Sequence, residues 1–233
     1  MKYLTDKQRI IFETALVLGV MLLVKDILDR FNTIGAGSIA MWSGIFIATY
    51  FMRKQDISWK DRGLTLPTGK KQWISTLGIA LITSALVLTM MAAIVPLISS
   101  LLGFTIPESS TDRFEFLIGN ALLFIAYLIV VIWLGAAVGE ELLMRGFLLN
   151  NLRSLFGQGR SRSFLAVLLH STIFGMLHIS QGVPGVIATG IVGAIFAIIY
   201  LSNNQKLFPL IIAHGIVNSI GLTAYFLSDG KIT

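Results

Sequence analysis

The sequence predicts an all-α, polytopic membrane protein, a bundle of about seven to eight transmembrane helices around a buried polar cavity. Of the 233 residues, 55% are hydrophobic and 13% are charged, whereas soluble chains carry roughly 25% charged residues. Most apolar runs approach or exceed the roughly 20 residues that cross about 30 Å of hydrocarbon. The chain shows no internal repeat and no low-complexity linker, so we expect residues 1–233 to form a single integral membrane domain.

Seven apolar runs define the expected spans. The first contains Glu13 and ends in a charged cluster without a small-residue cleavage site, so we expect a retained anchor and not a signal peptide. Pro96 is expected to kink the long third run. The expected spans are residues 10–24, 34–52, 73–104, 116–152, 164–179, 183–201 and 207–227.

The net charge of +6 predicts which side of the membrane each loop faces. If the spans alternate, thirteen Lys and Arg residues lie on the side of the N-terminus and four on the other. The positive-inside rule then places the N-terminus in the cytoplasm, and the short loops favour a bacterial cell membrane. The basic excess fits anionic lipid, so a lipid bilayer and no nucleic acid is expected as a partner. The chain lacks cysteine, which excludes disulfides and thiolate metal ligands.

Charged residues inside the fourth run predict a functional site, because charge in a membrane is costly. The run contains Glu140, Glu141 and Arg145 as GEELLMRG. Glu141 and Arg145 are four residues apart and share a helix face, so they form either a packing salt bridge or part of a site. Glu140 is rotated about 100° from Glu141 on an α-helix and can point elsewhere. It has no partner on its own helix, which favours a site.

All three histidines also lie in apolar runs. His178 follows Phe174 by one turn, and His214 precedes Asn218 by one turn. His170 has no polar companion, and we expect it to be structural. Measured from the basic ends of their helices at 1.5 Å per residue, Glu140, His178 and His214 lie about 12–24 Å deep. We therefore expect them to meet in one polar cavity.

Such a cavity could hydrolyse an amide bond by two routes. A carboxylate beside a histidine can activate water, while a second histidine and an asparagine stabilise the oxyanion. Alternatively, Glu140, His178 and His214 could bind zinc with an open fourth position. Neither an HExxH nor a GxSxG motif is present.

The three motifs EELLMR, FGMLH and HGIVN resemble EExxxR, FxxxH and HxxxN. These define the CAAX-protease and bacteriocin-processing (CPBP, or Abi) family of intramembrane peptidases. The resemblance covers residues 139–218, the expected peptidase core, and extends weakly to the segment DRGLTLP at residues 61–67. It implies a helical membrane fold, usually of eight helices, with an active site open to the cytoplasm.

The resemblance also implies a role for each motif residue. Glu140 would activate water together with His178, and His214 and Asn218 would stabilise the oxyanion. Glu141 and Arg145 would hold the first motif in place, with Phe174 in support. A glutamate-type mechanism without a required cofactor is preferred, because an amide such as that of Asn218 is a poor zinc ligand.

Three function classes stay open at this stage. An intramembrane endopeptidase acting on a membrane-embedded or amphipathic peptide or protein is favoured. A non-catalytic scaffold or bacteriocin-immunity protein on the same fold is the alternative. A proton-coupled transporter would show repeated halves, which are absent from the sequence. The small residues Gly185, Thr189, Gly193 and Ala197 permit close helix packing, within the bundle or in a homodimer.

Overall fold

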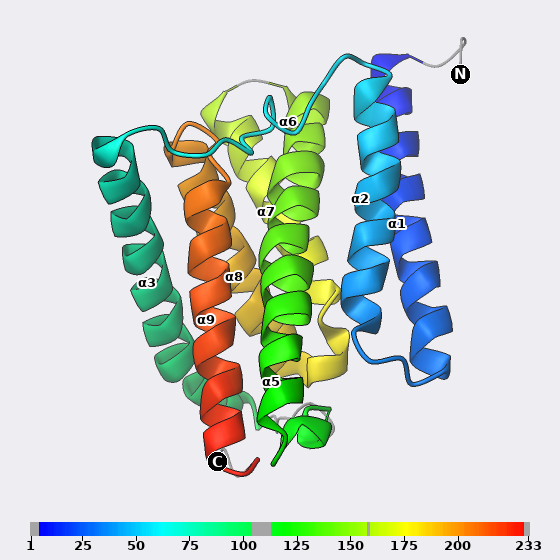
Figure 1. Cartoon of the computed structure of the whole chain (residues 1–233). Coiled ribbons are helices and arrows are strands. Elements are labelled where there is room, and N and C mark those ends of the chain that lie inside the picture. The colour runs from blue at the N-terminus through cyan, green and yellow to red at the C-terminus, as the bar shows by residue number, and fades with distance from the viewer. Residues whose placement is uncertain (1–4, 104–112, 158, 231–233) are drawn as a thin grey trace.

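The structure is a computed structural model that describes residues 5–103, 113–157 and 159–230. Seven long helices and no strands occur in this part of the chain. Consecutive long helices run in opposite directions along the bundle (Figure 1). They are α1 (Asp6–Arg30), α2 (Ala36–Arg53), α3 (Lys70–Leu102), a rod of α5 (Ala121–Tyr127), η2 (Leu128–Leu149) and α6 (Asn150–Phe156), then α7 (Arg160–Met176), α8 (Gly182–Ser202) and α9 (Phe208–Leu227).

The all-helical fold is confirmed, but the predicted number of spans is confirmed only in part. Four helices are long and apolar enough to cross a membrane, namely Lys70–Leu101, Ala121–Phe156, Ile179–Ser202 and Phe208–Leu227. An eighth long helix is not found in the described ranges. Of the other three, α7 has only 17 residues and α1 carries Glu13 and a charged C-terminal end. Together with the apolar outer surface, this identifies a multi-pass membrane protein.

Several predicted boundaries shift for local reasons. The fourth run was expected from residue 116, but Glu115–Leu117 forms a separate 3-10 turn, η1. The rod begins after Asn120, whose side chain caps it by accepting from the Leu123 amide at 3.0 Å. α3 continues through Pro96 to Leu102, and the expected end of that span at residue 104 lies outside the described residues.

The rod lies at the centre of the bundle. α2 and α9 pack along η2, α1 pairs with α2, and α3 packs against α9 and α8. α7 pairs with α8 and also contacts η2 and α6. The fully buried side chains of Leu143, Met144 and Leu148 make η2 the middle of the main apolar core. The site-bearing segment is therefore enclosed by helices on several sides.

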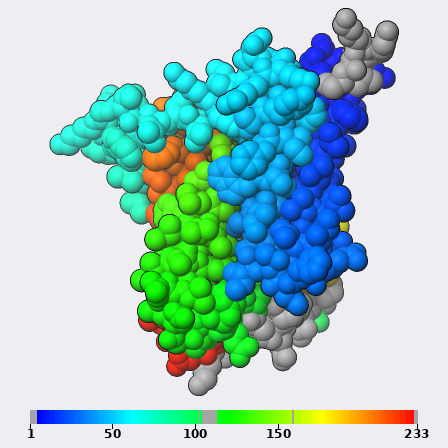
Figure 2. Space-filling model, turned by 45° about the vertical axis from the view of Figure 1, so that its right-hand side comes forward, coloured from blue at the N-terminus to red at the C-terminus, as the bar shows by residue number. Residues whose placement is uncertain are grey.

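The outer surface of the bundle is apolar. Large apolar side chains such as Leu23 of α1 and Phe46 of α2 are more than half exposed, and these two helices cover one side of the molecule (blue, Figure 2). Exposed apolar residues also follow the rod, including Ile129 and Val130. A contiguous surface of this kind is expected where lipid and not water is the solvent.

The loops lie at the two ends of the bundle, in the grouping that alternating spans predicted. The start of α1, the loop 54–69 and the connection between α8 and α9 lie at one end of the bundle (top, Figure 1). The turn between α1 and α2 and the end of α9 lie at the opposite end. We call the first the basic end, because it carries Lys54, Lys60, Lys71 and Lys206. Its assignment to the cytoplasm stays a prediction.

The loop 54–69 is fastened to the other helices at the basic end. The Tyr200 hydroxyl donates to the Arg62 carbonyl at 2.8 Å and accepts from the Asn150 amide at 2.8 Å. The Leu207 amide donates to the Gly63 carbonyl at 3.0 Å. Gly63 has φ +94°, and a Cβ there would lie 1.7 Å from the Gln205 carbonyl oxygen, so only glycine fits. This segment belongs to the DRGLTLP stretch noted in the sequence.

Candidate active site

The helix that carries the acidic motif is wound as a π-helix from Leu128 to Leu149. π-Helical turns are rare and frequent at functional sites. They have more residues per turn than an α-helix, so neighbouring side chains diverge by a smaller angle. With α-helical winding Glu140 could point elsewhere than Glu141, whereas the π-helical winding turns the two side chains closer to one direction. Both carboxylates reach the same histidine of α9.

Glu141 is the fixed centre of this cluster. Its Oε1 accepts from Arg145 Nη1 at 2.9 Å and lies 2.9 Å from His214 Nδ1. The side chains of Glu141 and Arg145 are 0% exposed. A carboxylate only accepts hydrogen bonds, so Nδ1 carries the proton and the Nε2 of a neutral His214 is an acceptor. Glu141 thus joins η2 to α9 and orients the imidazole.

Glu140 faces the other nitrogen of the same imidazole. Its Oε2 lies 3.9 Å from His214 Nε2, which is too far for a direct hydrogen bond. The two side chains are 17% and 13% exposed, unlike the enclosed Glu141 and Arg145. Glu140 and His214 Nε2 therefore form the accessible part of the cluster, and Glu141 and Arg145 form its buried support.

Two aromatic rings enclose the Arg145 guanidinium. Its Cζ lies 4.7 Å from the Phe174 ring centroid and 5.0 Å from that of Phe196. Phe196 also meets the His214 ring edge to face, at 5.7 Å between centroids. Arg145 Nε and Nη2 have no hydrogen-bond partner, so these cation–π contacts are their main compensation in the described structure. Phe174 has the supporting position that was predicted, whereas nothing in the sequence singled out Phe196.

His178 is placed differently from the prediction. The fifth span was expected to include it, but α7 ends at Met176, and His178 precedes the short 3-10 turn η3 (Ile179–Gln181). Its Nδ1 lies 2.8 Å from the Phe174 carbonyl, which makes Nδ1 the donor and leaves Nε2 free. The Phe174 and His178 rings are 4.9 Å apart. Within the described residues, His178 makes no ion pair with Glu140, and it is linked to the cluster through Phe174.

Asn218 and His170 lie outside the hydrogen-bonded cluster. Asn218 is half-buried on α9, one turn after His214, with no side-chain hydrogen bond to any residue that the structure describes. His170 is fully buried on α7, stacked parallel to Phe174 at 6.3 Å. Both of its ring nitrogens lack a partner, which agrees with the structural role expected for it.

The close approach of α9 to η2 depends on Gly215. A Cβ at this position would lie 2.6 Å from the Trp133 ring. Trp133 thus packs directly on the α9 backbone, beside His214. A larger residue would force the two helices apart and pull the imidazole from the carboxylates.

The predicted zinc ligands are only partly assembled. Glu140 and His214 lie near each other, but the described residues include no group of three His, Asp or Glu side chains arranged to hold a metal. His178 would have to approach Glu140 and His214 to complete the expected set. The donor arrangement therefore does not fit a preformed three-ligand zinc site.

Residues 121–220 match the family model described as type II CAAX prenyl endopeptidase Rce1-like. This region is similar to the Rce1-like family. The match begins with α5 and includes Glu140, Glu141 and Arg145 on η2, Phe174 and His178 at α7, and His214 and Asn218 on α9. It confirms the resemblance to the CAAX-protease family. The matched region is therefore that of a membrane protease, and proteases are hydrolases. No curated protein and no solved structure matches the chain.

Proposed function

We propose that the protein is an intramembrane endopeptidase that hydrolyses a peptide bond with water activated by Glu140 and His214. The observation that carries this proposal is the approach of Glu140 Oε2 to His214 Nε2 at 3.9 Å, where both side chains are partly accessible. The Rce1-like match supports the reaction class. A water bonded to both groups would be positioned and deprotonated at once.

The buried residues support this role by fixing one orientation of the imidazole. Glu141 accepts from Nδ1, and Arg145 holds Glu141 in place. Nε2 then presents its lone pair to the water. Glu140 takes the proton, the hydroxide adds to the substrate carbonyl carbon, and the proton is passed to the leaving amine as the C–N bond breaks.

The oxyanion formed in this step needs donors. Asn218 is the candidate on α9, because its amide is half-buried and not engaged by any described side chain. His214 can donate to the oxyanion only while both of its ring nitrogens carry protons. His178 follows α7, and its Nε2 is not used in the bond to Phe174. We also propose, as the family resemblance implies, that His178 pairs with Glu140 when water is activated. We propose that no metal is required.

The membrane arrangement belongs to the same proposal. All seven long helices would lie in the bilayer, with the basic end in the cytoplasm, as the positive-inside rule favours. The exposed apolar residues of α1 and α2 support this placement. The site would open to the cytoplasm and accept a membrane-embedded or amphipathic peptide, of which a prenylated CAAX peptide is one form to be tested.

The test is cleavage of a panel of membrane peptides, including a prenylated CAAX peptide, by purified protein in lipid nanodiscs. Glu140→Gln should reduce the rate by about 10²–10⁴-fold, the usual contribution of a general base. Glu13→Gln is the matched control, because Glu13 is another carboxylate within a helix of the bundle but bonds only Gln55, at 2.9 Å. Equal rates for Glu140→Gln and the wild type would overturn the mechanism. Specific peptide binding without cleavage, unchanged by Glu140→Gln, would favour the non-catalytic scaffold.

A further inference from the structure

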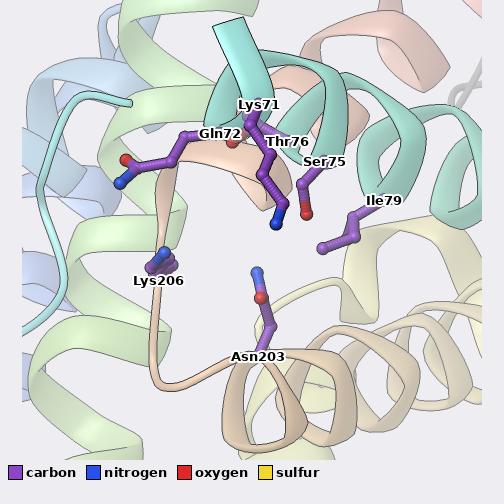
Figure 3. A pocket seen from close by; sticks show the side chains of 7 residues that line it. All are labelled: Lys71, Gln72, Ser75, Thr76, Ile79, Asn203 and Lys206. Carbon is purple, nitrogen blue, oxygen red and sulfur yellow. The ribbon is translucent and has the colours of Figure 1, made fainter. Parts of the chain in front are cut away.

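A polar cavity at the basic end lies apart from the candidate active site. It has a volume of about 210 Å³ and lies between the first turns of α3 and the connection from α8 to α9. Side chains from both segments point into it (Figure 3). Its polar lining consists of Lys71, Gln72, Ser75, Thr76, Asn203 and Lys206.

The chemistry of the lining favours an anion. No carboxylate lines the cavity, and neither Lys71 nor Lys206 forms an ion pair with any residue in the described ranges. The Asn203 Nδ2 is buried without a hydrogen-bond acceptor. Figure 3 shows the Asn203 amide and the Lys71 ammonium directed toward the same space. Two exposed lysines without an ion pair and a buried donor without an acceptor together favour a negatively charged ligand that accepts hydrogen bonds.

The surroundings of the cavity identify the level of the lipid headgroups. Trp73, next to the cavity residues of α3, meets Phe208 of α9 edge to face at 5.7 Å. Aromatic side chains concentrate at the boundary between headgroups and hydrocarbon. On α3, beside and beyond these residues, Ile74, Leu81 and Ile82 are 60–71% exposed. A molecule bound in the cavity can therefore place acyl chains on an apolar surface directly beside it.

We propose that this cavity binds the phosphate group of an anionic phospholipid, with its acyl chains along the exposed face of α3. The lysines supply the charge, and Asn203 and Ser75 supply hydrogen bonds to phosphate oxygens. The bound lipid joins α3 to the start of α9 at the basic end. The inference is independent of the proposed peptidase activity.

The experiment measures lipid binding to delipidated full-length protein in a neutral detergent. Phosphatidylglycerol, phosphatidylcholine and inorganic phosphate are added separately, and the melting temperature and lipid retention in native mass spectrometry are recorded. We expect phosphatidylglycerol to raise the melting temperature and to be retained, and the other two to do neither. In Lys71→Gln/Lys206→Gln, the apparent affinity for phosphatidylglycerol should fall by about tenfold or more, from roughly 1 kcal/mol per lysine.

Two further variants make the result specific. Asn203→Asp keeps the shape of the side chain but places a carboxylate in the cavity, so it should also weaken phosphatidylglycerol binding. Lys54→Gln/Lys60→Gln removes two exposed lysines at the same end but outside the cavity, and should bind as the wild type does. If Lys54→Gln/Lys60→Gln weakened phosphatidylglycerol binding equally, the effect would come from general surface charge, and the proposed site would be wrong. A melting shift with inorganic phosphate as large as that with lipid would show a free-phosphate site instead.

Discussion

His214 Nδ1 and Glu141 Oε1 lie 2.9 Å apart, and this polar contact links the last helix of the bundle to its central rod. The same carboxylate oxygen also accepts from Arg145. Glu141 therefore does more than the sequence predicted, since it pairs with Arg145 within the first motif and also orients the histidine. Glu140 is partly accessible and forms no close hydrogen bond with His214. A carboxylate proposed to accept a proton from water needs to be free in this way.

Removing one partner of the buried pair should be much more costly than removing both. Arg145→Leu leaves Glu141 charged and fully buried, so we expect a loss of about 3–5 kcal/mol in the free energy of unfolding. Glu141→Leu/Arg145→Leu should recover part of this loss, because apolar residues replace both charges although His214 Nδ1 loses its acceptor. Denaturant titration in detergent measures the difference. An equal loss in the single and double variants would contradict this account of the pair.

Replacing His170 should stabilise the protein. Its two ring nitrogens are buried without partners, and an unsatisfied buried polar group costs about 1–3 kcal/mol. We expect His170→Leu to raise the free energy of unfolding within that range and to leave peptide cleavage unchanged. The same titration, with a cleavage assay in parallel, tests this. A loss of stability or activity would show that His170 holds a buried water or contributes to the site.

A single methyl group at Gly215 should disturb the site. Gly215→Ala places Cβ against Trp133, and overpacking of this kind costs about 1–3 kcal/mol. We expect lower stability, a strongly reduced cleavage rate, and rescue by the second substitution Trp133→Leu. Gly221→Ala on the same helix is the control, because a Cβ there has no neighbour within 4 Å. It should be neutral or slightly stabilising. Retained activity in Gly215→Ala would mean that the spacing of α9 and η2 is not critical.

A strong chelator should leave cleavage unchanged. The reason is that His178 is not grouped with Glu140 and His214 as a third ligand. The measurement is the cleavage rate of purified protein with and without chelator, followed by added zinc. Loss of activity that zinc restores would establish the metal-dependent route, and would require His178 to move toward the other two residues.

The fold could be predicted from the sequence to the extent that hydrophobicity determines it. Seven apolar runs became seven long helices, because each run can satisfy its backbone only as a helix. The end of the bundle at which each loop lies was predicted by letting consecutive spans alternate in direction. The charge cluster of α1, the short α7, and an 18-residue α2 that includes polar residues and Arg53 leave four helices that meet the criteria of length and apolar composition in the described residues.

The site could be predicted as a set of residues, but not as a set of contacts. The motifs identified Glu140, Glu141, Arg145 and His214, and these do meet. The pairing of Glu141 with Arg145 was anticipated, but the winding was not, because an α-helix was assumed for a segment that is a π-helix. His178 was placed inside a helix, although the chain leaves α7 two residues earlier. The roles of Phe196 and Trp133 depend on packing between distant segments, which carries no local sequence signal.

The bond between Gly63 and Leu207 has a consequence for biosynthesis. The two residues are 144 positions apart in the sequence. At about 5–20 residues per second, synthesis of that interval takes roughly 7–30 s. During this time the loop 54–69 is already synthesised, but its partners Tyr200 and Leu207 are still to be made. The loop can therefore be fastened in this way only after α8 and the residue that precedes α9 have been synthesised.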